Sequence, residues 1–434
     1  MIEQRRSTPQ SISFLCSLGL FLAGYLFYSS SFIESYYAAD FHLSSWQIGI
    51  AQATIPLGAM VGAVLAGWLA DIFGRHRLLV WNFLLLIFAG MLGGFAFDYY
   101  SLCATRAING FLAGTLYPLC AAYLIEMTTQ TALARQTARL MFINCLAAPT
   151  ACLLGLLLTY FFNEHIIWRL LASVQIIPAA MAYSLSRQLP ESEVWFQSAI
   201  KSKTAFNPLK QFGILFNPTY RYITICLTGA WFLMDVAYYG INFFVHYLLN
   251  IIEVHALPNT VSTNALLSQK TIWSSFIINI FFMLGALASI FVIERIDLYK
   301  LQKYGFLFAS LSLFLLACFF YTGSNHLFVV ILLFILFNFS INIGPDVTTY
   351  LLSATSYPVE IRASGHGMIA GLAKFGSFLG VLLLPKMQDS FGHETVIFLL
   401  SGLLFAAYLF TIQLARAATD DVSTMQGEVS YETN

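Results

Sequence analysis

The chain consists of long apolar runs separated by short polar segments. Each run is continuous and about 20 residues or longer, the length that an α-helix needs to cross the hydrocarbon core of a bilayer. A membrane barrel would instead place an apolar residue at every second position. The pattern predicts an all-α membrane protein with 12 transmembrane helices, over residues 13–37, 47–70, 77–97, 101–126, 137–160, 166–186, 220–250, 271–293, 303–322, 326–353, 364–385 and 394–415.

The longest polar interruption divides these runs into two sets of six. It predicts an N-terminal six-helix bundle over residues 1–186, a cytoplasmic inter-bundle loop over 187–219 and a C-terminal six-helix bundle over 220–416. The polar residues 417–434 are expected to form a disordered cytoplasmic tail. The first run is too long for the apolar region of a signal peptide and lacks a clear small-residue cleavage site, so we interpret it as a span.

Basic residues predict the orientation. If the N-terminus lies in the cytoplasm, only Arg169, Lys270 and Lys386 among the loop lysines and arginines fall on the opposite side of the membrane. Cytoplasmic loops of membrane proteins are enriched in Lys and Arg. We therefore expect a multi-pass plasma membrane protein with both termini in the cytoplasm, and the short loops suit a bacterial inner membrane.

Composition narrows the possible functions. The chain is 59% hydrophobic and 10% charged, against about 25% charged residues in soluble proteins. Its formal net charge of zero argues against nucleic-acid binding. Single cysteines in apolar runs and scattered histidines predict no disulfide framework, metal site or cofactor. Because the sequence shows no nucleophile–base pair, we expect no catalytic residues and no enzymatic activity. We also expect a monomer whose partner is the lipid bilayer.

The loop after the second run has the most specific motif, Gly67-Trp-Leu-Ala-Asp71-Ile-Phe-Gly74-Arg75-His-Arg77. The glycines allow a tight turn between two helices, and Asp71 can accept hydrogen bonds from the N-terminus of a neighbouring helix. The motif resembles the G-x-L-A-D-x-x-G-R-x-R/K signature of the major facilitator superfamily, in which this loop stabilises the outward-facing state. The alternative is an ordinary positively charged cytoplasmic loop.

Further charged positions extend this resemblance. Pro190-Glu191-Ser192 resembles the P-E-S motif of sugar-porter-like members, and the segment from Pro358 to Gly365 resembles a P-x-E-x-R-x-x-G motif. The resemblance implies two pseudo-symmetric six-helix bundles, with ion pairs at their cytoplasmic ends that break when this side opens. We expect gating or inter-domain roles for Gly67, Asp71, Gly74, Arg75, Arg77, Arg106, Glu126, Glu191, Glu294, Arg295, Glu360 and Arg362.

Two charges lie deep in the C-terminal spans. Asp235 is near the middle of the seventh span, and Trp231 and Tyr239 share its helix face because they lie four residues away on either side. Lys374 lies about ten residues into the eleventh span. Charges at this depth are costly and mark functional sites by default. An Asp235–Lys374 pair that only holds helices together is the alternative to a transport site.

The same stretches resemble the phosphate:proton symporter family. Its patterns W-x-x-x-D-x-x-x-Y-G, G-P-N-x-T-T and S-x-H-G-x-x-x-x-x-x-K-x-G are similar to the segments that begin at Trp231, Gly344 and Ser364, and Tyr117-Pro-Leu resembles its D-Y-P-L. From these matches we expect substrate binding by Tyr117, Asn144, Trp231, Asp235, Tyr239, Asn342, Asp346 and Lys374. Because the N-terminal half lacks two acids that the family uses for proton movement, we expect proton coupling through Asp235, Asp346 and Lys374 instead.

The chain also departs from this family. Its first span has no acid before Glu34, Leu116 replaces the aspartate of the fourth span, and Asp346 replaces the asparagine of G-P-N. An added carboxylate would repel a dianion unless it is protonated. We expect a secondary transporter that imports a small polar solute together with a proton, and inorganic phosphate is the leading candidate. A sugar, polyol or organic-acid symporter is the alternative, followed by a drug or metabolite exporter.

Overall fold

The structure is a computed structural model that describes residues 9–201, 213–256, 264–323 and 326–431. Every regular element in these ranges is a helix. The N-terminal half contains α1 (Pro9–Asp40), α2 (Ser45–Phe73), α3 (Arg75–Gly94), α4 (Tyr99–Met127), α5 (Gln130–Cys145), α6 (Ala147–Phe161), α7 (Glu164–Ser173), α8 (Ile176–Ser186) and α9 (Glu193–Lys201). The C-terminal half contains α11 (Arg221–Ala256), α12 (Asn264–Val292), α13 (Leu298–Tyr321), α14 (Leu327–Ile343), α15 (Pro345–Thr355), α16 (Arg362–Phe391) and α17 (His393–Tyr431).

The helices agree with the predicted spans. Within the described ranges, 11 segments are long and apolar enough to cross a membrane, and a shorter apolar helix, Phe276–Val292, lies in the remaining predicted span. The all-helical, multi-pass fold is therefore confirmed. Helix α17 continues to Tyr431, into the segment 417–434 for which we expected disorder, but its side chains beyond residue 417 lie outside the described part. The predicted limits of the bundles, loop and tail stay predictions.

Three spans are each made of two helices, which the apolar pattern did not predict. The breaks lie at Leu146, at Val174–Gln175 and at Gly344. At the third break Pro345 has no N–H to continue the helical ladder. A Cβ on Gly344 would lie 2.5 Å from the carbonyl oxygen of Leu301, so α13 packs directly against the break. Helix α15 therefore starts inside the span, with Asp346 in its first turn.

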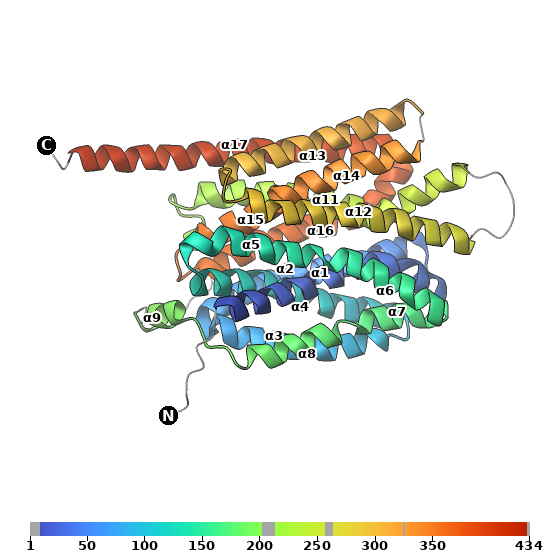
Figure 1. The fold of residues 1–434 in the computed structure, drawn as a ribbon, viewed down its shortest axis with the longest axis horizontal. Helices are drawn as coiled ribbons and strands as arrows, with labels where there is room; N and C mark the ends of the chain where they lie inside the picture. Colours follow the sequence, from blue (N-terminus) through green and yellow to red (C-terminus); the bar gives the residue numbers. More distant parts are fainter. Residues whose placement is uncertain (1–8, 202–212, 257–263, 324–325, 432–434) are drawn as a thin grey trace.

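The helices form two bundles that lie side by side. In Figure 1 the helices α1–α8 occupy the lower part of the molecule and α11–α17 the upper part, with both termini at the same end. Helix α2 packs against α16 across the boundary, and α4 packs against α15 and α16. A Cβ on Gly67 would lie 2.3 Å from the carbonyl oxygen of Ala363, so the two backbones touch there. Such close approach by small residues is typical of helix packing in membranes.

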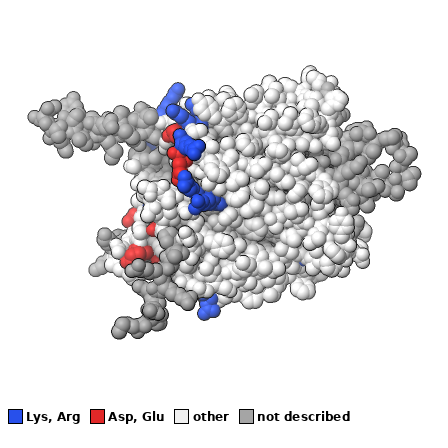
Figure 2. Space-filling model, in the orientation of Figure 1, with Lys and Arg blue, Asp and Glu red and all other residues white. Residues whose placement is uncertain are grey.

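Charged side chains gather at one end of the molecule. Figure 2 shows Lys, Arg, Asp and Glu near the end that holds both termini, while the rest of the visible face is almost free of them. We call this the charged end. Large apolar side chains such as Trp81, Phe88 and Phe308 are more than half exposed, as expected for a surface in contact with lipid.

Candidate functional site

A small buried cavity lies between the two bundles. Its volume is about 20 Å³, room for about one water molecule, so the structure represents a state in which the site is closed. Helices from both halves contribute its lining, which comprises Tyr28, Tyr117, Met141, Asn144, Trp231, Asp235, Tyr238, Tyr239, Asp346, Tyr350 and Lys374.

Asp235 and Lys374 form a buried ion pair at this cavity. Lys374 Nζ donates to Asp235 Oδ2 at 2.9 Å, and each side chain is 2% exposed. Ser377 Oγ donates to the same carboxylate oxygen at 2.9 Å. The spacing of Trp231, Asp235 and Tyr239 in α11 does bring them to one cavity, as the sequence predicted. A buried ion pair is stable only when its geometry is close and further hydrogen bonds are present. The Asp235–Lys374 pair meets both conditions.

Aromatic rings surround the lysine. Its Nζ donates to the Tyr239 hydroxyl at 3.1 Å. It also lies 4.4 Å from the Tyr239 ring centroid, 4.8 Å from that of Tyr117 and 5.2 Å from that of Phe27. Because the ring faces are negative, they attract the ammonium group. Tyr117 and Phe27 belong to the N-terminal half, so Lys374 connects the two bundles at the site.

Asp346 lines the same cavity but is placed differently. It lies in the first turn of α15 and is only partly covered by protein atoms. Among the residues that the structure describes, none forms a hydrogen bond or ion pair with its side chain. Two carboxyl groups therefore share the cavity with one lysine, and the lysine is already paired with Asp235.

The remaining expected binding residues are two asparagines. Asn144 lines the cavity and donates through Nδ2 to the carbonyl oxygen of Leu20 at 2.7 Å. Asn342 does not line it. Its Nδ2 donates to the carbonyl oxygen of Asn338 at 2.6 Å, along its own helix, and its Oδ1 faces Cys145 Sγ at 3.5 Å. Seven of the eight expected binding residues thus meet at the cavity, and Asn342 is the exception.

Two hydrogen bonds between the bundles flank the cavity, and the sequence analysis missed most of the tyrosines involved. The hydroxyls of Tyr28 and Tyr238 lie 2.9 Å apart, joining α1 to α11. Tyr350 donates to the carbonyl oxygen of Tyr117 at 3.1 Å, joining α15 to α4. The only sequence signal for these site residues was the clustering of tyrosines in the spans around Gly24 and Tyr239. These bonds connect the two bundles around the closed cavity.

A buried charge cluster joins the bundles at the charged end. Arg75 has a fully buried side chain that lies 2.9 Å from Asp71 and 3.0 Å from Glu126. It also donates to the carbonyl oxygen of Val359 in the other half at 2.9 Å. Arg362 lies 3.5 Å from the same Glu126. The structure therefore brings these predicted gating residues together across the interface.

Two carboxylates in this region cap helix N-termini. Asp71 accepts from the backbone N–H of Ser364 at 2.8 Å and from its hydroxyl at 2.6 Å, at the start of α16, so the predicted contact with a neighbouring helix is found. Glu191 accepts from the backbone N–H groups of Arg75, His76 and Arg77 at the start of α3. Carboxylates are stabilising at these positions because a helix N-terminus is positively polarised.

The other predicted gating residues are more exposed. Glu294 pairs with Arg135 across the two halves, and Glu360 accepts from Ser198 of α9 at 2.8 Å. Arg77 and Arg295 are exposed at the charged end. Gly74 adopts φ +101°, a conformation that favours glycine, and a Cβ there would lie 2.3 Å from Glu191 Oε2.

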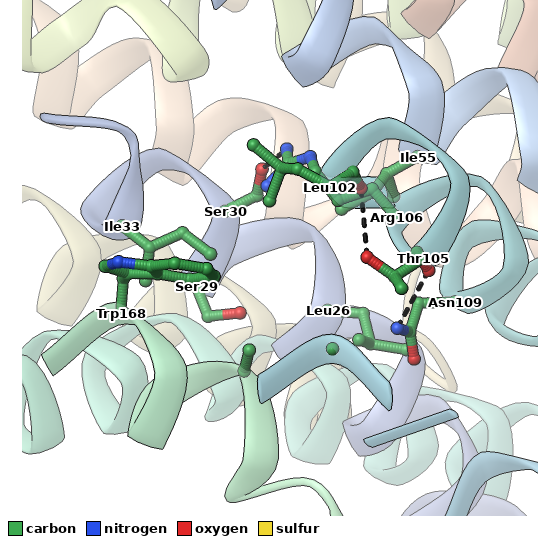
Figure 3. A pocket seen from close by; sticks show the side chains of 12 residues that line it. Leu26, Ser29, Ser30, Ile33, Ile55, Leu102, Thr105, Arg106, Asn109 and Trp168 are labelled. Atoms are coloured by element: carbon green, nitrogen blue, oxygen red, sulfur yellow. Dashed lines mark hydrogen bonds between the residues drawn. The ribbon is translucent and has the colours of Figure 1, made fainter. Parts of the chain in front are cut away.

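Arg106 lies apart from this cluster, which corrects the expectation of an inter-domain role. It lines a second cavity of about 30 Å³ inside the N-terminal bundle. Figure 3 shows Trp168 and Ile33 across that cavity from Thr105 and Asn109. The reason is its position near the start of α4, which runs toward the charged end and reaches it only at Glu126.

The Arg106 guanidinium is held by uncharged partners. Its Nε donates to the carbonyl oxygen of Ala51 at 2.7 Å, and its Nη2 donates to Gln52 Oε1 at 2.7 Å and to Ser30. Gln52 Nε2 in turn donates to Glu34 Oε2 at 2.6 Å. Glu34 thus balances the buried cation through a glutamine instead of by direct contact.

Comparisons with known proteins agree with this architecture. Residues 16–381 match the Major Facilitator Superfamily. Low affinity inorganic phosphate transporter 4 of Petunia hybrida is 21% identical over 89% of this chain and 82% of its own length. Inner membrane metabolite transport protein YgcS of Escherichia coli is 24% identical over 85% and 82%.

Among solved structures, the proton:xylose symporter XylE bound to 6-bromo-6-deoxy-D-glucose has the same fold. It matches with a TM-score of 0.78 at 17% identity, over 93% of this chain and 95% of XylE. A family match over most of the chain, two helical bundles and a buried charged cavity between them lead to one conclusion. The chain belongs to the Major Facilitator Superfamily and is a membrane transporter.

Proposed function

We propose that this protein imports a small polar solute together with a proton by alternating access, with inorganic phosphate as the leading substrate. The observation that carries the proposal is the Asp235–Lys374 pair at a cavity between the bundles. A buried ion pair that faces a cavity can exchange its partners when the cavity opens, whereas a purely structural pair has no reason to border one.

The pair suggests how proton and anion are coupled. When Asp235 binds a proton, Lys374 loses its counter-charge and can bind one negative charge of the substrate. The cavity then gains one proton and one anion, so its net charge does not change. A buried lysine without either partner would be strongly unfavourable. This mutual requirement is a coupling free energy between proton and substrate, and by linkage it acts in both directions.

Phosphate is supported by the donors around the cavity and by relatives named as inorganic phosphate transporters. Lys374, the hydroxyls of Tyr117 and Tyr239 and the Trp231 indole can all donate hydrogen bonds. An oxyanion offers several acceptor oxygens to such a set. Alternating access by rocking of the bundles would expose these groups first on one side and then on the other.

The charge cluster supports a direction for the gate. We infer that the charged end faces the cytoplasm of a bacterial inner membrane and that Arg75, Glu126 and Arg362 keep this side closed in the present state. Opening would separate Arg75 from Val359 and Arg362 from Glu126, since these contacts cross the bundles. We further propose that the protein works as a monomer, without a cofactor or catalytic activity.

A sugar or polyol symporter is the second candidate, because one observation favours it. The cavity contains a second carboxyl group, Asp346, and five tyrosines, which suit hydroxyl-bearing solutes better than a dianion. The fold neighbour XylE is a proton:xylose symporter.

Uptake of radiolabelled phosphate into liposomes containing the purified protein would test the proposal. With an inward proton gradient we expect accumulation that disappears in Asp235→Asn. A gradient-driven accumulation of xylose or of a polyol, with no phosphate uptake, would instead support the second candidate. Phosphate accumulation that persists in Asp235→Asn would show that another group binds the coupled proton.

A further inference from the structure

Asp346 occupies a fixed position at the cavity. The break between α14 and α15 places it in the first turn of a helix that begins within the span. A Cβ on Gly305 of α13 would lie 2.1 Å from the Pro345 ring, so α13 packs tightly against the residue before Asp346. The backbone there has little freedom to withdraw the carboxyl group from the cavity.

The charges of the cavity leave Asp346 without compensation. Lys374 already donates to Asp235 and to Tyr239. No other lysine or arginine lines the cavity, and within the described ranges no donor reaches the Asp346 carboxyl group. A carboxyl group at a closed cavity that receives no hydrogen bond calls for an explanation. A bound substrate could supply the hydrogen-bond donor that the Asp346 carboxyl group lacks.

We propose that Asp346 is a specificity-determining residue that accepts a hydrogen bond from a substrate hydroxyl and rejects oxyanions that have no proton to donate. An ionised carboxylate has only acceptor oxygens, so it can bind only groups with O–H or N–H. Protonated phosphate has such a group, and so do sugars and polyols. Sulfate has the same tetrahedral shape as phosphate but has no proton near neutral pH.

This inference deepens the proposed function, on which it rests, and names the common feature of both candidate substrates. Binding sulfate would place its oxygens against the Asp346 oxygens, leaving two acceptors in contact without a hydrogen bond. Sites built to receive a substrate hydroxyl reject analogues that lack it by factors of about 10⁴ or more. Both anions are repelled by a carboxylate, so the preference comes from the hydrogen bond that only phosphate can donate, and we expect phosphate to bind at least about a hundredfold more tightly than sulfate.

Binding to the purified protein at pH 7.5 tests the inference, by calorimetry with inorganic phosphate and with sulfate at equal ionic strength. The variants are Asp346→Asn, whose amide can donate to sulfate, and Asp346→Glu, which keeps the carboxylate. We expect the wild type and Asp346→Glu to prefer phosphate, and Asp346→Asn to bind both anions within about threefold of each other. Thermal unfolding without ligand identifies any variant that is misfolded, and Asp346→Ser then serves as a second neutral variant.

Equal binding of the two anions by the wild type would overturn the inference. So would an unchanged preference in folded Asp346→Asn, or the failure of every variant to bind either anion. The outcome is separable from that of the proposed function. A wild type that prefers phosphate in binding but does not accumulate it under a proton gradient would contradict proton-coupled phosphate import and leave the role of Asp346 standing.

Discussion

Replacing Asp235 by asparagine isolates the energetic role of the buried ion pair. The substitution keeps an oxygen that can accept from Lys374 and Ser377 at about the same positions. It removes the negative charge beside an ammonium group that is 2% exposed. Breaking a buried pair on one side costs about 3–5 kcal/mol. Lys374 still contacts the Asn oxygen, the Tyr239 hydroxyl and three ring faces. We therefore expect a loss of stability at the low end of this range, about 3 kcal/mol.

The double substitution Asp235→Asn with Lys374→Gln is the matched control. It removes both charges, so neither group is left buried without its counter-charge. If the single substitutions each destabilise the protein by about 3 kcal/mol, the double variant should lose much less than their sum, with a coupling of at least about 2 kcal/mol. Thermal unfolding of the purified variants measures this. All three variants should lose proton-driven uptake, because the first lacks the acid, the second lacks the cation and the third lacks both.

Two results would refute this reasoning. A double variant as unstable as the sum of the single variants would show that Asp235 and Lys374 do not compensate each other. A double variant that is stable and still accumulates substrate under a proton gradient would show that the pair only holds α11 to α16. Stability and uptake together therefore separate a transport site from a structural pair.

Three further predictions concern contacts between the bundles. Gly67→Ala should destabilise the protein by about 1–3 kcal/mol, because its Cβ would lie 2.3 Å from a backbone carbonyl of α16. Gly49→Ala in the same helix meets nothing within 4 Å and should be neutral or stabilising by up to about 1 kcal/mol in the same thermal unfolding assay. Tyr28→Phe and Tyr238→Phe should each cost about 0.5–1.5 kcal/mol, and the pair no more than one of them, since they share one hydrogen bond; an additive loss would contradict this. Arg135→Ala breaks an ion pair whose arginine side chain is 50% exposed. The melting temperature of the variant should therefore be close to that of the wild type, with a loss of stability below about 1 kcal/mol that becomes smaller at high salt.

Several features of the site could be predicted without the structure. Residues four apart on a helix share a face, so Trp231, Asp235 and Tyr239 were expected to line one site, and they do. A charge deep in an apolar span needs a partner, so the sequence singled out Asp235 and Lys374, with a pair between them as the alternative to a transport site; the structure shows that they do pair. The expected contact of Asp71 with a helix N-terminus is also present, at Ser364. In each case the local spacing of residues or the energetic cost of a buried charge was sufficient to predict the contact.

Other features needed tertiary information. Arg106 was grouped with the gating charges, yet its partners Ser30 and Gln52 come from neighbouring helices of the same bundle. Asn342 faces along its own helix although it lies near cavity residues in sequence. The contribution of Tyr28 depends on a hydroxyl supplied by Tyr238, which is distant in the chain. Such contacts depend on how helices are rotated and shifted against each other, which an apolar run does not encode.

By itself, the sequence determined that the chain crosses a membrane repeatedly and which charges must be buried. This follows because the bilayer penalises every unpaired backbone or charged group, so length and apolarity suffice. Only the tertiary structure decided which buried groups meet. It paired Lys374 with Asp235 and left Asp346 without a described partner at the same cavity. The physical reason is that Lys374 can pair closely with one carboxylate at a time in this geometry, and helix packing decides which one is near enough.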